Sequence, residues 1–217
     1  NLILWICFFI IWGIGVAYSF TGSQVATHIE LNSFHTPFLD NFFKVITEFG
    51  GNLPFFLIGI FMLFNLREGF FLLLAQGICA IITQIFKYTF THPRPYTLFN
   101  NLGIDLPPTV EGVDLWHAYN SFPSGHTQTS VGVYGGLAKA FKSKILRIIC
   151  ICLCILIPLS RLYLGVHTFE DVIISVLLAI TFVFVFYPFI DKNFNNKKKM
   201  NYLMITMFIL CLAHLLY

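Results

Sequence analysis

Charged side chains are scarce in this chain of 217 residues: aspartate, glutamate, lysine and arginine make up 11%, whereas hydrophobic residues make up 57%. A soluble domain carries about a quarter charged residues. A chain this apolar cannot bury all of its hydrophobic surface in its own core, so lipid must cover part of it. The composition therefore excludes a soluble domain and predicts an integral membrane protein.

Patterns that indicate several other functions are missing as well. No basic patch is interleaved with aromatic residues, so we expect no nucleic-acid partner. No His-Glu-x-x-His or similar ligand spacing occurs, so we expect neither a catalytic metal nor a cofactor. The cysteines all lie inside apolar runs, which favours lipid- or core-facing residues over a disulfide framework.

Long apolar runs predict an all-α fold, a polytopic bundle with six core transmembrane helices. The six runs are residues 2–20, 53–66, 70–90, 125–141, 145–164 and 169–190. A further run, 202–217, is close to the minimum spanning length and is expected as a C-terminal seventh helix. A cleaved signal peptide is the alternative for residues 2–20, although no basic residues precede that run.

The segments between these runs are expected to be short or irregular. Residues 21–36 are polar and carry no predicted helix, and turn signals make residues 92–123 a loop. From Pro37, apolar residues recur at helical spacing opposite polar ones, which predicts an amphipathic helix on the membrane surface between the first two spans. Without an internal repeat or a separate soluble part, residues 1–217 are expected to form a single domain.

The distribution of lysine and arginine orients this scheme. Most of these cations fall on one side of the predicted spans, which the positive-inside rule makes the cytoplasmic side. They are Arg67, Lys139, Lys142, Lys144, Arg147, Lys192 and Lys197 to Lys199. The other side holds Lys44, Lys87, Arg94 and Arg161. The last three belong to the stretches that contain candidate site residues.

A cation, an imidazole and a carboxylate lie within residues 160–171, between two long apolar runs. Ionisable groups at membrane depth are costly, so they indicate a functional site. If a helix begins near Thr168, Asp171 can hold one nitrogen of His167 and leave the other free as a base or nucleophile. The planar, positively charged guanidinium of Arg161 can donate two hydrogen bonds to an anion. The alternative is a helix N-cap with acidic residues in the first turn.

Two other stretches on the same predicted side suit an anion. Lys87 closes the third span, and Arg94 follows between two prolines. Ser124, Gly125 and His126 open the fourth span, where backbone N–H groups, a hydroxyl and an imidazole would face a phosphate. For Lys87 and Arg94, the alternative is that both side chains extend to lipid headgroups. For the stretch at Ser124, the alternative is an ordinary helix N-cap.

Taken together, these stretches resemble the signature of the type 2 phosphatidic acid phosphatase family. The three parts are Lys-x6-Arg-Pro, Pro-Ser-Gly-His and Ser-Arg-x5-His-x3-Asp, and they cover residues 87–171 without a departure. The resemblance implies metal-independent hydrolysis of a lipid phosphate or diphosphate through a phosphohistidine. Together with the distribution of lysine and arginine, it implies a multi-pass protein of the cytoplasmic membrane, with its active site facing the periplasm or exterior.

The resemblance assigns a role to each signature residue. His167 is the expected nucleophile, Asp171 its orienting partner, and His126 the acid that protonates the leaving oxygen and then activates water. The expected phosphate ligands are Lys87, Arg94, Ser124, Gly125 through its backbone N–H, and Arg161. Among the remaining histidines, we expect His92 to be structural, with a place in the lining of the site as the alternative, and His117 to approach the headgroup. His28, His35 and His214 are expected at membrane boundaries.

The expected partners are the bilayer and a membrane lipid phosphate. Undecaprenyl diphosphate or phosphatidylglycerol phosphate ranks first, with the 1-phosphate of lipid A as an alternative. A lipid-phosphate binding or transport protein of the same fold is the non-enzymatic alternative, and a vanadate-holding haloperoxidase-like site is a third. The sequence gives no indication of oligomeric state.

Overall fold

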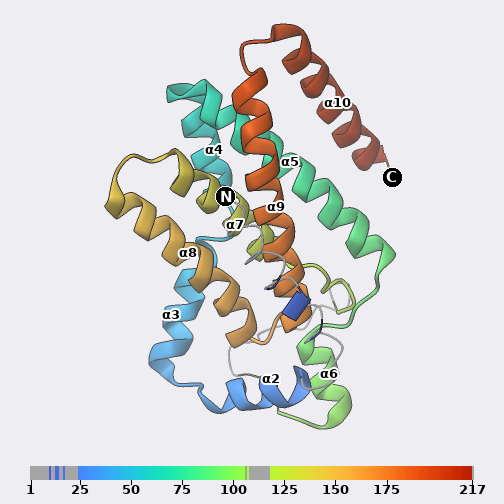
Figure 1. Cartoon of the computed structure of the whole chain (residues 1–217). Coiled ribbons are helices and arrows are strands. Elements are labelled where there is room, and N and C mark those ends of the chain that lie inside the picture. Colours follow the sequence, from blue (N-terminus) through green and yellow to red (C-terminus); the bar gives the residue numbers. More distant parts are fainter. Residues whose placement is uncertain are drawn as a thin grey trace.

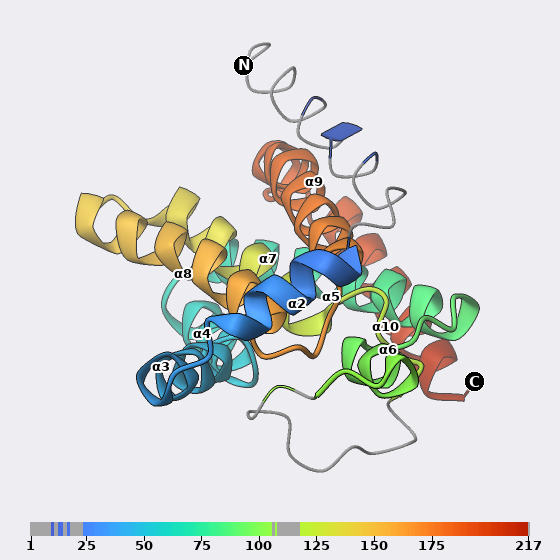
Figure 2. The same ribbon diagram turned by 90° about the horizontal axis from the view of Figure 1, so that it is seen from below.

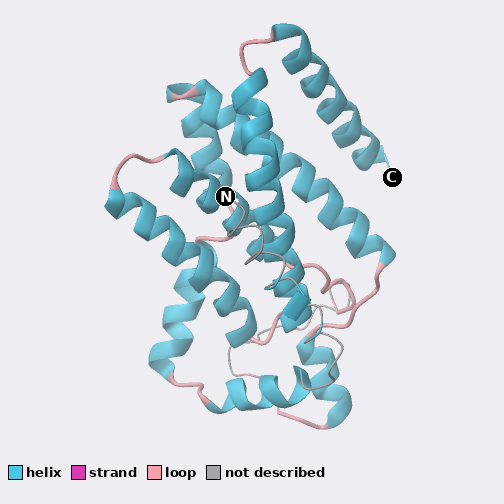
Figure 3. Ribbon diagram, viewed as in Figure 1, coloured by secondary structure: helices cyan, strands magenta, loops and turns pink. Residues whose placement is uncertain are grey.

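The computed structural model describes residues 24–105, 107 and 118–216, together with residues 10, 13, 14 and 17. Every regular element in this part of the chain is a helix (Figures 1 and 3), apart from an isolated bridge between His92 and Asn120. The expected all-α bundle is therefore confirmed. Most of the first predicted span, 2–20, lies outside the described residues.

The centre of the bundle is α7 (Gly125–Ala140), which α5 (Leu66–Thr89), α8 (Lys144–Tyr163) and α9 (Phe169–Asn193) surround. Its side chains Val133 and Leu137 are almost fully buried. A Cβ at Gly136 would lie 2.5 Å from Cδ2 of Leu72, so only glycine allows α5 and α7 to pack this closely. This contact fixes the first turns of α5 against the last turn of α7, at the end of the bundle opposite the start of α7.

Four segments are long and apolar enough to span a membrane within the part of the chain that is described. Three of them are α5, α8 and α9, which begin and end within four residues of the predicted spans. The fourth combines α3 (Pro37–Glu48) with α4 (Leu53–Phe64), which follows it in series across Gly50 and Gly51. The α7 helix has only 16 residues and is shielded from lipid by its neighbours.

The amphipathic α3 helix has the predicted start, with Thr36 as its N-cap and Pro37 in its first turn. Its setting differs from the expected one: α3 packs along the end of α8 and stands in line with α4 (Figure 1). The physical reason is that its apolar stripe has a protein partner. Phe43 is buried against Tyr163 of α8, with their ring centroids 4.4 Å apart.

Two helices were not predicted from the sequence. The first is α2 (Gln24–Ser33), which crosses the end of the bundle in Figure 2, and the second is α6 (Pro95–Leu102), inside the expected loop. Pro95 starts α6, and Gly103 ends it with a φ of 68° that favours glycine. The ring of His28 connects the two helices, because it packs against Phe99 of α6 and Phe169 of α9.

The bundle has two chemically different ends. The α4–α5, α7–α8 and α9–α10 connections lie towards the upper end in Figure 1, where α10 (Lys197–Leu216) turns back along α5. Arg67 forms an ion pair with Asp191 there, and Nζ of Lys139 lies 3.9 Å from the centroid of the Tyr187 ring. The starts of α7 and α9 point towards the opposite end, where α2 crosses the bundle.

Candidate active site

The side chains of His167 and Asp171 meet at the start of α9. Thr168 is the N-cap of this helix: its hydroxyl accepts the N–H of Asp171, and Asp171 Oδ2 accepts the N–H of Thr168 at 2.8 Å. The same Oδ2 lies 3.2 Å from Nδ1 of His167. The capping box therefore fixes the carboxylate against the imidazole, and the N-cap and catalytic interpretations of this stretch are compatible.

A further hydroxyl contacts this pair. Ser121 Oγ donates to Asp171 Oδ2 and lies 3.4 Å from Nδ1 of His167. Ser121, His167 and Asp171 are all buried, which shields the three polar groups from competing water. Ser121 precedes the Pro-Ser-Gly-His stretch and was not among the predicted residues, since an isolated serine in a loop gives no sequence signal.

The start of α7 is bonded directly to the start of α9. The backbone N–H of Ser124 donates to the carbonyl of Asp171 at 3.2 Å, and the Ser124 hydroxyl caps α7 by accepting the N–H of Thr127. This bond places Gly125 and His126, the first residues of α7, beside the His167–Asp171 pair. His126 is close enough to Arg161, Arg94 and Lys87 for their charges to act on its ring.

Three cations from three different elements face the same region, and each is tethered by a hydrogen bond. Arg94 Nη1 donates to the carbonyl of Val166, the neighbour of His167, at 2.9 Å. Lys87 Nζ donates to the carbonyl of Asn120 at 2.8 Å. Arg161 Nη1 donates to Oγ1 of Thr47 on α3 at 2.7 Å, while its buried Nε has no partner among the described residues. Such a cluster suits an anion that bears more than one charge.

Burial sets the protonation state of the imidazole at the centre of the site. It lowers the pKa of His167 to about 3, against the opposing effect of the Asp171 carboxylate. The ring is therefore neutral near pH 7. Burial also lowers the pKa of the Arg94 guanidinium, which remains charged at neutral pH. The site combines an uncharged imidazole with fixed positive charge.

All of the predicted site residues lie at this one end of the bundle. They are Lys87, Arg94, Ser124, Gly125, His126, Arg161, His167 and Asp171. His117 and the side chain of His214 are outside the described residues. His35 pairs with Asp40 at 2.7 Å on the α2–α3 connection, away from the His167–Asp171 pair. Among the described residues, no group of three or more His, Cys, Asp or Glu side chains is arranged to hold a metal ion.

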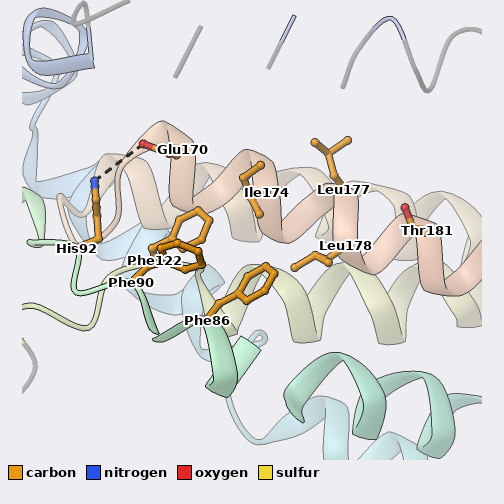
Figure 4. A pocket seen from close by; sticks show the side chains of 9 residues that line it. All are labelled: Phe86, Phe90, His92, Phe122, Glu170, Ile174, Leu177, Leu178 and Thr181. Atoms are coloured by element: carbon orange, nitrogen blue, oxygen red, sulfur yellow. Dashed lines mark ion pairs between the residues drawn. The ribbon is translucent and has the colours of Figure 1, made fainter. Parts of the chain in front are cut away.

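An apolar cavity of about 500 Å³ opens beside the site, between α5, α9 and the segment before α7 (Figure 4). Phe86, Phe90 and Phe122 form one wall, and Ile174 and Leu178 of α9 form another. Its polar end is formed by His92 and Glu170, the residue before Asp171. The cavity therefore runs from His92 and Glu170 along the first half of α9, as far as Thr181.

Comparison with family models gives a match to residues 68–195, more than half of the chain, and the matching model is described as the PAP2 superfamily. This segment includes the three cations, both histidines of the site and Asp171. The matched region therefore contains the entire charged cluster.

Among curated proteins, sphingosine-1-phosphate phosphatase 1 of Mus musculus is 28% identical over 165 residues. The alignment covers 70% of this chain but only 36% of that relative, so the chain spans about a third of its length. Phosphatidylglycerophosphatase B of Bacillus subtilis (strain 168) is 27% identical over 171 residues, which cover 72% of this chain and 77% of the relative.

Two crystal structures share the fold. The Bacillus subtilis transmembrane PAP2-type phosphatidylglycerolphosphate phosphatase has a TM-score of 0.67 and 25% identity, and the match covers 86% of this chain and 96% of that one. LpxE of Aquifex aeolicus has a TM-score of 0.65 and 24% identity, with 76% and 94% covered. The latter likeness supports the fold alone.

Proposed function

The chain belongs to the PAP2 superfamily, and we propose that it is a lipid phosphatase that transfers a phosphoryl group from a membrane lipid to His167 and then to water. One observation carries the proposal: a neutral, buried imidazole lies against a carboxylate, and three tethered cations surround the pair. Such an arrangement suits a nucleophile that attacks a phosphorus atom whose oxygens are held by positive charge.

The first step follows from the orientation of His167. Its Nδ1–H donates to Asp171 Oδ2, which leaves Nε2 with its lone pair free. As Nε2 forms a bond to phosphorus, the bond from phosphorus to the lipid oxygen breaks. Burial and the nearby cations disfavour a charged His126 ring, so His126 takes up a proton when the anionic phosphate binds among those cations, and it donates this proton to the leaving oxygen. The positive charge that develops on the His167 ring is stabilised by Asp171.

The second step regenerates the ring. His126, now without its proton, accepts one from water as the water oxygen attacks phosphorus and the P–N bond breaks. Lys87, Arg94 and Arg161 hold the phosphoryl oxygens in both steps, together with the Ser124 hydroxyl and the backbone N–H of Gly125 at the start of α7. These donors supply positive charge at positions where many phosphoryl-transfer enzymes use Mg²⁺, so we propose a metal-independent reaction.

Substrate and orientation follow from the surroundings of the site. The apolar cavity that begins at His92 and Glu170 suits a hydrocarbon chain, which supports a lipid substrate. We rank phosphatidylglycerol phosphate first, since a relative with this named activity aligns over 77% of its own length. Undecaprenyl diphosphate is next, followed by lipid A 1-phosphate. Cations at the opposite end of the bundle support a site that faces away from the cytoplasm.

Phosphate release by the purified protein in detergent micelles tests the proposal. We expect release from at least one of the ranked lipid phosphates, at the same rate with and without EDTA, and none from His167→Ala. A protein that binds these lipids without releasing phosphate would instead support the binding or transport alternative. Loss of activity in EDTA, or near-normal turnover by His167→Ala, would contradict the proposed chemistry.

A further inference from the structure

The two carboxylate oxygens of Asp171 have unequal surroundings. Oδ2 has His167 Nδ1, Ser121 Oγ and the backbone N–H of Thr168 around it. Oδ1 is buried as well, but it has no hydrogen-bond partner in the described part of the chain. An unpaired carboxylate oxygen in a buried position is costly, so a donor is needed on this side of Asp171.

The nearest candidate donor is His92, whose Nδ1 lies 3.7 Å from Asp171 Oδ1. This nitrogen is also buried and without a hydrogen-bond partner among the described residues. On the other side of the ring, Nε2 lies 3.9 Å from Oε2 of Glu170, a pair drawn in Figure 4. Both separations exceed the usual length of a hydrogen bond by less than about 1 Å. Hydrogen bonds at catalytic sites are often this long without substrate and shorten when substrate binds.

The backbone holds His92 in this position. The carbonyl of His92 accepts the N–H of Ser121 at 3.1 Å, and His92 forms the isolated bridge with Asn120. Its ring lies 6.4 Å from that of Phe122. The ring is thus aimed at the two carboxylates by the same short segment that supplies Ser121 to the site.

Only one protonation state of His92 satisfies both carboxylates. A neutral imidazole has one N–H, whereas the imidazolium has an N–H on each nitrogen. We propose that His92 is a positioning residue: as the imidazolium it bridges Glu170 and Asp171 and holds Asp171 in the orientation that His167 requires. Activity then falls as pH rises and the bridge loses its proton. This inference rests on the proposed function for its effect on turnover.

The charged groups around the ring favour this assignment. The α9 helix presents Glu170 and Asp171 to it, while the α8–α9 connection presents His167 on the far side of Asp171. The cations on neighbouring elements are Lys87 of α5, which bonds the Asn120 carbonyl, and Arg94, two residues along the same segment. Both cations have carbonyl partners of their own, so the two carboxylates are the groups that directly face His92.

Kinetic pH profiles of three variants test the proposal, with the lipid phosphate that the wild type hydrolyses. In His92→Gln we expect kcat at pH 6 to fall about tenfold, as for loss of one charge-assisted hydrogen bond, with KM within about twofold. The part of the alkaline decline of kcat that the His92 proton causes should disappear, so that only the part caused by the His126 acid remains. Glu170→Gln should move the His92 part of the decline to lower pH by about one unit, because a carboxylate that stabilises the imidazolium is gone. His92→Lys, with its fixed charge, should lack the part of the alkaline decline that the His92 proton causes.

A matched control is His35→Gln, which breaks a histidine–carboxylate pair with Asp40 outside the site and should leave the shape of the profile unchanged. If His92→Gln lowers kcat equally at every pH, His92 is only structural and the proposal is wrong. NMR titration of histidine-labelled protein provides a readout without turnover: Glu170→Gln should lower the pH at which the His92 ring deprotonates, and an unchanged titration would contradict the bridge. A wild type that releases no phosphate would contradict the proposed function, while the titration still decides the bridge.

Discussion

His167 precedes α9 and Asp171 lies in its first turn, with Nδ1 of the histidine 3.2 Å from Oδ2 of the aspartate. That oxygen also accepts the backbone N–H of Thr168, so one carboxylate both caps the helix and orients the imidazole. Substitution of Asp171 therefore affects folding and chemistry together. Residues that touch the pair without capping α9 separate the two effects.

Ser121→Ala is such a substitution. It removes the hydroxyl that donates to Asp171 Oδ2 and leaves the capping box intact. We expect kcat to fall about tenfold, the equivalent of one hydrogen bond of roughly 1.4 kcal/mol, with little change in KM. The control is Ser175→Ala, which removes a buried hydroxyl that donates to the backbone carbonyl of Asp171. Equal losses of kcat in the two variants would contradict a role for Ser121 in orienting the carboxylate.

His126→Ala should block the first step only for substrates whose leaving group must be protonated, and it should slow the second step for every substrate. With a lipid phosphate, an alkoxide must be protonated as it leaves, so we expect no measurable turnover. With p-nitrophenyl phosphate, whose leaving group needs no proton, the first step should proceed and phosphoenzyme should accumulate. Rapid-quench measurement of a burst of p-nitrophenol, equal to the enzyme concentration, checks this. Steady turnover without a burst would contradict the role of His126 in activating water.

Arg94→Lys should weaken the phosphate site, although it conserves the charge. Arg94 donates to the Val166 carbonyl, and a planar fork can hold that carbonyl and a phosphoryl oxygen together where a lysine cannot. We expect kcat/KM to fall about 10- to 100-fold, or roughly 1.4–2.7 kcal/mol. Competitive inhibition by vanadate should weaken in parallel. Arg67→Lys, at the opposite end of the bundle, serves as the control and should stay within about twofold of the wild type. Parallel losses in both arginine variants would indicate general destabilisation.

His28→Phe should make stability less sensitive to acid. Burial between Phe99 and Phe169 lowers the pKa of His28 to about 4. The folded ring is therefore neutral, whereas the unfolded ring takes up a proton below about pH 6.5. Stability is lost as pH falls through this range, by roughly 2 kcal/mol at pH 5 from this group. Thermal unfolding in detergent at pH 7 and pH 5 should show a smaller decrease of Tm in the variant. An identical decrease would contradict the buried, neutral state of His28.

The sequence predicted the long helices well, because local signals define their ends. Thr36, Ser143 and Thr168 cap α3, α8 and α9, and apolar runs of spanning length lie between the caps. The α2 and α6 helices were missed, since they are short and are held by contacts from distant segments, such as His28 against Phe99. The placement of α3 in line with α4 was missed for a similar reason, because the partner of Phe43 is Tyr163, far along the chain.

The candidate site divides in the same way. Motif spacing predicted the residues that the structure brings to one end of the bundle, from Lys87 to Asp171. It did not predict Ser121, or Thr47 as the partner of Arg161, because neither has a local pattern and both act through tertiary contacts. His92 was expected to be structural, since its two carboxylate neighbours lie in a different motif and become adjacent only in the folded chain.

Identification of the phosphorylated residue tests the central claim most directly. Radiolabelled lipid phosphate is mixed with the protein, the reaction is stopped in alkali within milliseconds, and the labelled peptide is mapped by mass spectrometry. We predict a phosphate that is stable in base, labile in acid and attached to His167, and its absence from His167→Ala. Label on a serine or on His126, or water attack without any labelled protein during rapid turnover, would contradict the account.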